Sequence, residues 1–436
     1  MVSKNIVMKV STLSAILLLA LLPNIASAKT VISCPTVGPA GVVSPSLVAG
    51  GKYSRCNLSG ANLSGANLTN VDLSSANLSG ANFVGANLDG TKLTGANLSG
   101  LVSGGITGAP ATTPYQWKLV SGFLIGPGAD LRNKDLDGIS LFKTNLVGAN
   151  ITGAKLSGTD LSGLASGSLI GSPSSLPVGW NLIEGHFVGP YSYLYGAKFS
   201  GKFLRGVILT GAKLSFADFT SADLIGANLA QSHSTDTNLA GANVSNGNLY
   251  RADLRRANLS GTNLSNAILS GALLQFANLS GANLTGANLS GADLANANLT
   301  GADLTGANLT GAKFPAAILN NTKLAGSTLT GVRSGEITGA PDSLPTGCKV
   351  VNGYLVGPGA YLVGANFANA DLANLNLTSA NFGLANLTNA TLTNSTVTST
   401  KFGTATLSGV ISGSLIGSTT SLPSGWKIQS GNLIKR

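Results

Sequence analysis

Charged side chains are scarce in this sequence. They make up 10% of its 436 residues, whereas ordinary globular domains carry about 25%. The three cysteines and two histidines are too few for a zinc site of recognisable spacing. A glycine-rich phosphate loop, a series of metal ligands and a pair of catalytic carboxylates are also missing. We therefore expect no metal, no cofactor and no enzymatic activity.

Long apolar runs are missing as well, except at the N-terminus. Lys4 and Lys9 precede a short apolar run from Leu13 to Leu22, and Ala26-Ser27-Ala28 offers a small-residue cleavage site. This order is typical of a secretory signal peptide, and the run is too short to span a bilayer. The sequence thus predicts a signal peptide at residues 1–28, no membrane span in the mature chain, and an extracellular, cell-surface or periplasmic location.

The basic excess of the mature chain is mild. The full sequence has 26 Lys and Arg against 16 Asp and Glu, and removal of the leader takes away Lys4 and Lys9 but no acid, which leaves a net charge of +8. Such an excess is compatible with an acidic envelope polymer as partner, and equally with ordinary solubility. Clustered basic and aromatic motifs of the nucleic-acid-binding kind are absent, so we expect no nucleic-acid partner.

Two cysteines, Cys34 and Cys56, lie near the predicted mature N-terminus. Outside the cytoplasm a disulfide can persist, so a possible bridge between them would close this end of the chain. Two free thiols are the alternative. Cys348 stands far from both in the sequence.

A unit of five residues dominates the rest of the sequence, as in Ala282-Asn283-Leu284-Thr285-Gly286. A period of five fits neither the 3.6 of a helix nor the 2 of a strand, so the chain must turn at every unit. Regularly spaced Leu can be stacked out of water, at about 1.5 to 3 kcal/mol for each buried side chain. This gain favours a solenoid over disorder, despite the 58 glycines.

The unit runs without interruption in four registers of the central apolar residue. They contain 9, 7, 28 and 10 copies, from Leu58 to Leu98, Leu131 to Leu161, Leu194 to Leu329 and Leu362 to Leu407. This A-[N/D]-L-[S/T]-G pattern resembles that of the pentapeptide-repeat proteins. The resemblance implies an all-β fold, a right-handed quadrilateral β-helix with four units per coil, in which the central Leu and the preceding Ala point inward. The residue types agree, because Ala suits a narrow lumen and Gly tolerates the positive φ of a repeated corner.

Three gaps of equal length separate the four registers, and each carries the same motif. In the first gap, Ser103-Gly104 leads to Trp117 and then to a Gly-Pro pair. The turns Ser121-Gly122 and Asn352-Gly353 lie between β-prone runs, which predicts β-hairpins. Cys348 holds the Trp position of the third copy, which favours a packed apolar role over a reactive thiol.

A fourth copy of the motif closes the chain at Trp426. We expect it to cover the end of the coil, because an open solenoid end exposes backbone groups and Leu side chains. The sequence does not decide whether the inserts interrupt the coil or project from it. The predicted organisation is a signal peptide (1–28), an N-terminal cap (29–55), β-helical blocks (56–100, 129–163, 192–331 and 360–409), hairpin inserts (101–128, 164–191 and 332–359) and a C-terminal hairpin cap (410–436).

Two clusters depart from the repeat and are candidates for partner contact. The first follows the second insert and combines aromatic with basic side chains: Tyr191, Tyr193, Tyr195, Lys198 and Arg205. The second consists of three outward-facing arginines: Arg251, Arg255 and Arg256. Exposed rings could stack on sugars, and the arginines could contact an anionic polymer. Sealing of a junction and an ordinary solvated face are the respective structural alternatives.

The hexapeptide from Gln231 to Asp236 contains Ser, His and Asp, with Ser234 in the position usually held by Leu. A hydrolase is not expected, since neighbours along one strand cannot adopt the geometry of nucleophile, base and orienting group. A bulge or a locally wetter core is the structural interpretation. With four units per coil, Asp236 lies one coil from Arg256, which predicts an exposed ion pair of little energetic value.

The sequence thus favours an exported, non-catalytic structural or interaction scaffold. Its partner is unknown, either an envelope or extracellular protein or a polysaccharide. A carbohydrate- or surface-binding module at residues 191–205 is the alternative, and ice binding is a lesser one, because the outward positions lack a consistent threonine file. Some members of the resembled family mimic duplex DNA in shape and negative charge. A basic chain with an export leader disagrees with that role.

Overall fold

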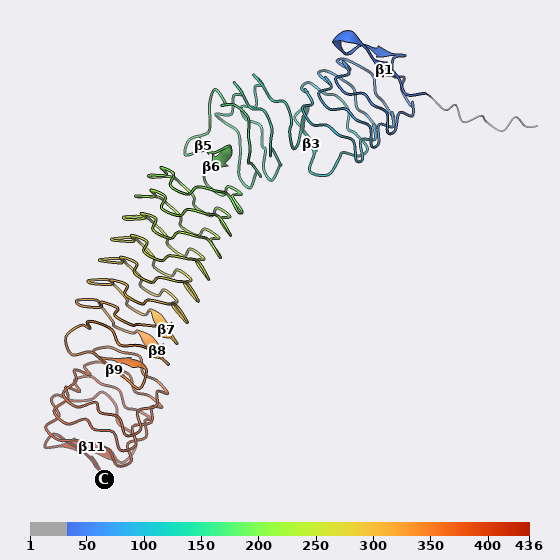
Figure 1. Cartoon of the computed structure of the whole chain (residues 1–436). Helices are drawn as coiled ribbons and strands as arrows, with labels where there is room; N and C mark the ends of the chain where they lie inside the picture. Colours follow the sequence, from blue (N-terminus) through green and yellow to red (C-terminus); the bar gives the residue numbers. More distant parts are fainter. Residues whose placement is uncertain (1–32) are drawn as a thin grey trace, which may run out of the picture.

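The computed structural model describes residues 33–436 as a right-handed quadrilateral β-helix. The coils stack into an elongated rod that changes direction between the N-terminal blocks and the long central block (Figure 1). The predicted signal peptide, residues 1–28, lies outside the described residues. Within residues 33–436, no helix has the length and apolar character needed to cross a membrane.

Each coil consists of four five-residue units and is joined to the next coil by parallel backbone ladders. Asn283 forms a bridge with Asp303, one coil further along the chain. The Leu284 N–H donates to the Asp303 carbonyl at 2.7 Å, and the Asn283 N–H donates back to the Thr262 carbonyl at 2.9 Å. The central Leu and the preceding Ala point inward and are almost fully buried along the array, as in Leu284 and Ala282. Stacked Leu and Ala side chains therefore form a dry core, which consists of an N-terminal, a central and a C-terminal apolar cluster.

The second and fifth positions of each unit make the corner. In the unit around Leu284, the Thr285 N–H donates to Oδ1 of Asn283 at 3.1 Å, which closes an Asx turn. The amide of Asn283 in turn donates to Oδ1 of Asn263 on the previous coil, at 3.3 Å. Gly286 has a φ of +67°, in the left-handed region. These contacts explain why the repeat favours Asn or Asp before Leu and Gly at its end.

The N-terminal cap begins with β1 (Thr36–Val37), the short 3-10 turn η1 (Pro39–Gly41) and β2 (Val43–Ser44), which pairs antiparallel with β1. A disulfide joins Cys34 to Cys56, with 5.3 Å between their Cα atoms. The first coil already starts inside the range predicted as cap, since Lys52 bridges Asp72. The cap is therefore shorter than the range 29–55.

The inserts contain antiparallel hairpins that share one turn geometry. They are β3 (Lys118–Val120) with β4 (Phe123–Ile125), β5 (Asn181–Ile183) with β6 (His186–Val188), β9 (Lys349–Val351) with β10 (Tyr354–Val356), and β11 (Trp426–Gln429) with β12 (Asn432–Lys435). Both turn residues have positive φ, +46° at Ser121 and +78° at Gly122 in the first hairpin. That combination defines a type I′ turn. The remaining strands, β7 (Lys313–Pro315) and β8 (Arg333–Gly335), are a parallel ladder between consecutive coils.

Much of each predicted insert still belongs to the coil. In the range 101–128, Val102, Thr107 and Thr112 form bridges with the preceding coil. The hairpin itself occupies only residues 118–125, and the next coil resumes where Asp130 bridges Val102. An insert thus lengthens one coil by the residues of its hairpin. A single ladder of backbone bridges joins this coil to the next one. The C-terminal range 410–436 likewise continues the coil before its hairpin begins.

A serine holds every hairpin against the adjacent coil. Ser103 Oγ accepts a hydrogen bond from the N–H of Leu124 at 3.1 Å. The other copies repeat this contact at 2.9 to 3.0 Å: Ser166 with Phe187, Ser334 with Leu355 and Ser412 with Leu433. Both partners of the first contact are buried. The recurring spacing of the motif therefore places an acceptor next to a strand N–H that would otherwise be unpaired.

The Trp position of the motif packs against the glycine of the Gly-Pro pair. A side chain at Gly126 would collide with the Trp117 ring, and one at Gly357 would collide with the sulfur of Cys348. Cys348 is half-buried, packs against the central apolar cluster and forms no disulfide. Burial raises the pKa of its thiol above the ordinary value, which keeps the thiol protonated and poorly nucleophilic.

We expect deletion of residues 410–436 to abolish a cooperative melt and to cause aggregation. The deletion uncovers the last coil, because Leu415 and Leu433 are buried members of the C-terminal apolar cluster. Thermal unfolding by circular dichroism with light scattering measures both effects. Deletion of Arg436 alone is the control, and an unchanged melt in the long deletion would refute the capping role.

Ser103→Ala should lower the free energy of unfolding by about 1 to 3 kcal/mol, because it leaves the buried N–H of Leu124 without an acceptor. Ser99→Ala removes an exposed hydroxyl and should change it by less than about 0.5 kcal/mol. Denaturant unfolding of the two variants provides the comparison. Equal stability would show that the serine contact contributes nothing.

Candidate functional site

Within the described residues, one face of the rod carries most of the exposed aromatic side chains. Its second-position ladder is continuous through five coils: Tyr193, Lys213, His233, Asp253 and Leu273. We call this ladder, together with the corners at its two ends, the aromatic-basic face. The corner before the ladder holds Phe142, Lys143, Tyr191, Gln231, Tyr250 and Arg251, and the corner after it holds Tyr195, Phe216, Arg255, Arg256 and Phe276.

Exposed aromatic rings concentrate on the aromatic-basic face. Among the residues that the structure describes, only Tyr115 and Phe203 are exposed aromatics elsewhere. Tyr193 and Tyr195 stack with ring centroids 6.4 Å apart, and the Tyr195 ring lies 5.3 Å from that of Phe216. A cluster of large exposed rings is unusual on a soluble monomer and marks an interaction site.

Several of these side chains occupy the fifth position, where the backbone is left-handed. Tyr191, Phe216 and Phe276 have φ values of +56°, +61° and +61°. A left-handed conformation costs a non-glycine residue about 1 to 2 kcal/mol, and most coils avoid the cost with Gly or Asn. All aromatic residues with positive φ in the described part of the chain lie on this face. The fold tolerates this strain at positions where the consensus residue would relieve it.

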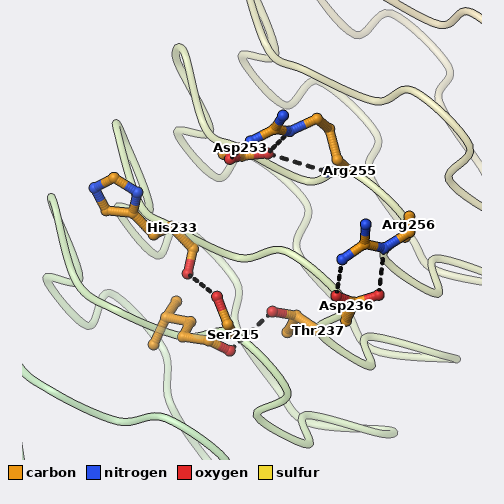
Figure 2. A network of polar contacts seen from close by, with 8 residues as sticks. Ser215, His233, Asp236, Thr237, Asp253, Arg255 and Arg256 are labelled. Atoms are coloured by element: carbon orange, nitrogen blue, oxygen red, sulfur yellow. Dashed lines mark hydrogen bonds and ion pairs between the residues drawn. The ribbon is translucent and has the colours of Figure 1, made fainter.

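Two bidentate ion pairs lie at the centre of the face (Figure 2). Arg256 donates to Asp236 with Nε–Oδ1 and Nη2–Oδ2 distances of 2.8 and 2.5 Å, which is the predicted pair. Arg255 donates to Asp253 at 2.8 and 2.7 Å. The hydrogen bonds from the two arginines lower the pKa of Asp236 and of Asp253 below the ordinary carboxyl value. Both carboxylates therefore keep their charge to a lower pH than an ordinary aspartate does.

The Ser-His-Asp hexapeptide does not form a catalytic group. Ser234 is fully buried and hydrogen-bonded to Ser232 at 2.8 Å, so it belongs to a locally polar core. The His233 side chain lies outside and points away from Asp236 (Figure 2). Successive side chains alternate between the lumen and the surface, which prevents nucleophile and base from meeting. Among residues 33–436 there is also no group of three His, Cys, Asp or Glu side chains suited to a metal ion.

Two grooves are hollowed into the aromatic-basic face. The first, of about 600 Å³, crosses the second insert and is lined by Phe142, Lys143, Asp160, Ser162, Gly163, Tyr191, Gly211, Lys213, Gln231 and His233. The second, of about 570 Å³, is lined by Thr235, Arg255, Arg256, Gln275 and Phe276. Both have the size and the mixed apolar and polar lining of ligand sites.

The pattern of the pentapeptide repeats family matches the sequence in eight copies: residues 54–90, 128–163, 192–224, 217–256, 252–291, 292–331, 359–389 and 370–409. These segments cover more than half of the chain. The chain belongs to the pentapeptide-repeat family. No curated protein matches it.

Solved pentapeptide-repeat structures resemble parts of the chain. QnrB1, a plasmid-mediated fluoroquinolone resistance protein, is 20% identical over 49% of this chain and 91% of its own, with a TM-score of 0.27. HetL, involved in heterocyst differentiation regulation in Nostoc sp. strain PCC 7120, is 23% identical over 65% of this chain and 89% of its own, with a TM-score of 0.16. A protein of the Arabidopsis thaliana thylakoid lumen is 32% identical over 26% of this chain and 68% of its own, with a TM-score of 0.10.

The predicted contact residues of this pentapeptide-repeat chain divide between faces. The aromatic-basic face brings together Tyr191, Tyr193, Tyr195, Arg251, Arg255 and Arg256. Lys198 and Arg205 lie on the following faces of the coil, where they pair with Asp218 at 3.9 Å and Asp223 at 2.6 Å. These two basic residues neutralise neighbouring carboxylates and do not face the grooves.

Sequence reasoning missed several residues of the face. Phe142, Lys143, Lys213, Phe216, Gln275 and Phe276 line the grooves or join the aromatic cluster. Phe216, Asp236, Arg256 and Phe276 occupy the same position of four successive coils. Alignment of the repeat by coil rather than by unit would have placed them in one column.

We expect the melting temperature to fall below about pH 4, where the carboxylates of the two ion pairs become protonated. Asp236 and Asp253 have lowered pKa values in the folded state, so their contribution is complete above the unfolded value of about 3.9 and is lost as the pH falls through the folded value. Asp236→Asn should make the acid decline less steep, and so should Arg256→Gln, which removes the cation. An acid decline unaltered in both variants would contradict this assignment.

Proposed function

We propose that the protein is an exported, non-catalytic interaction scaffold, a rigid rod that presents the aromatic-basic face to an envelope or extracellular partner. The observation that carries this proposal is the concentration of exposed aromatic side chains, interleaved with basic ones, on one face. The other outward positions hold mainly Asn, Asp, Ser and Thr. A surface feature concentrated on one side of a rod suits lateral binding to a partner.

The absence of a catalytic role is supported by the chemistry of the described residues. The nucleophile candidate Ser234 is buried, and the thiol of Cys348 is kept protonated by its packing. The acids of the aromatic-basic face, Asp236 and Asp253, are occupied by arginines. Pentapeptide-repeat proteins are also generally structural or interaction proteins rather than enzymes.

Export is supported by two features. Residues 1–28 have the order of a secretory signal peptide, and the disulfide between Cys34 and Cys56 is the kind of bond that persists outside the cytoplasm. The same basic, exported character argues against the DNA-mimicking role known in the family, which requires negative charge. Mixed side chains in the second-position ladders argue against ice binding.

Cell fractionation with N-terminal sequencing tests the exported state. We expect the chain outside the cytoplasm with Lys29 as its first residue, and a variant without residues 2–28 should stay in the cytoplasm. In vivo cross-linking of the exported chain should then recover an envelope or extracellular component. A full-length chain found only in the cytoplasm, with its N-terminus intact, would overturn the proposal.

A further inference from the structure

The strained aromatic residues of the face are the starting point. Tyr191, Phe216 and Phe276 stand at left-handed positions, yet 54%, 52% and 62% of their surfaces are exposed. Their rings therefore contribute little to the core, and Gly at each position would remove the strain. Rings that stay exposed at strained positions suit a role in binding better than a role in the core.

The first groove joins aromatic walls to a charged rim. The Tyr191 ring lies over Gly211, where any side chain would collide with it. Phe142 also lines the groove, with the ammonium of Lys143 at 4.7 Å from its ring centroid. Asp160 accepts a hydrogen bond from the Ser162 N–H at 3.0 Å, and Lys213 and His233 complete the rim. The groove thus offers ring faces together with donors and acceptors of hydrogen bonds.

The second groove repeats this combination further along the rod. Phe276 supplies the exposed ring, and Arg255 and Arg256 supply guanidinium groups. The buried Oε1 of Gln275 has no hydrogen-bond partner among residues 33–436. The Gln275 side chain adds a polar group to the lining of the second groove.

Charge on the face favours an anionic ligand. Within the described residues, Lys143, Lys213 and Arg251 have no carboxylate partner. Arg251 instead lies over the Tyr250 ring at 5.1 Å from its centroid. Asp160 is the one acid that lines the first groove. The excess of cations would repel a basic partner and attract an acidic one.

The spacing of the grooves favours a linear polymer. Tyr193 and Asp253, at the level of the two grooves, are three coils apart, which corresponds to about 14 Å along the rod. Lys213 and His233 bridge the interval on the same ladder. A small ligand would occupy one groove, whereas an extended chain lying along the ladder would contact both.

We propose that the aromatic-basic face binds an anionic polysaccharide along its length, with sugar rings stacked on Tyr191 and Phe276 and acidic groups paired with Lys213 and Arg251. This inference rests on the proposed function, which it makes specific by naming the partner's chemistry. Aromatic rings suit the apolar faces of sugars, and the exposed His233 can exchange hydrogen bonds with hydroxyl groups. Lysine and arginine suit carboxylates.

Binding of the mature chain, residues 29–436, to polygalacturonate tests the proposal, with uncharged dextran as the reference polymer. We expect saturable binding to polygalacturonate that weakens as salt is raised, and binding to dextran at least about tenfold weaker. Equal binding to both polymers would overturn the anionic class, and binding to neither would overturn the site.

Variants that restore the consensus residue of the repeat distinguish a loss of binding from a loss of folding. Tyr191→Gly combined with Phe276→Gly should weaken binding by about tenfold or more, without lowering the melting temperature, because it relieves two left-handed residues. Lys213→Asn with Arg251→Gly should weaken binding and reduce its salt dependence. Phe203→Asn is the matched control, since Phe203 is an exposed ring two faces away.

Unchanged affinity in the Tyr191→Gly and Phe276→Gly variant, or an equal loss in Phe203→Asn, would overturn the assignment of the site. The outcome is separable from that of the proposed function. An exported chain that recovers an envelope component by cross-linking but does not bind polygalacturonate would contradict only the polysaccharide inference.

Discussion

The backbone ladder between coils is the constraint on which the rest of the structure depends. The Leu284 N–H bonds to the Asp303 carbonyl of the next coil, and the Asn283 N–H bonds to the Thr262 carbonyl of the previous one. This exchange fixes the coil at four units and forces the first and third positions of every unit into the lumen. The outward second, fourth and fifth positions can vary in residue type. The aromatic-basic face is formed by side chains at all three of these positions.

The same constraint explains how far the sequence alone could lead. The five-residue period predicts a solenoid, and the resemblance to pentapeptide-repeat proteins implies a β-helix with four units per coil. The pair between Asp236 and Arg256 follows from that coil length, because the two residues are 20 positions apart. The hairpins follow from their two-residue turns. The extent of the coil inside the inserts could not be foreseen, since Val102, Thr107 and Thr112 lack the repeat pattern and yet form backbone bridges with the preceding coil.

The residues of the candidate site show more clearly what the sequence alone cannot predict. Lys198 and Arg205 are close to Tyr195 in sequence, yet each unit turns the chain onto the next face, so they diverge from it in space. Conversely, Phe142 and Tyr191 meet in one groove across an insert that lengthens the coil. The coil length decides which residues lie side by side on adjacent coils of a solenoid. Each insert lengthens one coil and so changes this relation at one level.

The single ladder that crosses each insert has a mechanical consequence. Within a block four ladders resist separation of adjacent coils, whereas at the second insert only the bridge between Ala165 and Tyr193 remains beside the hairpin packing. Under load, bending and tension would therefore concentrate at these three levels, while the rod stays rigid within the blocks between them. The first groove lies across one of these levels, so flexing the rod there would change the spacing of Phe142 and Tyr191, which line it.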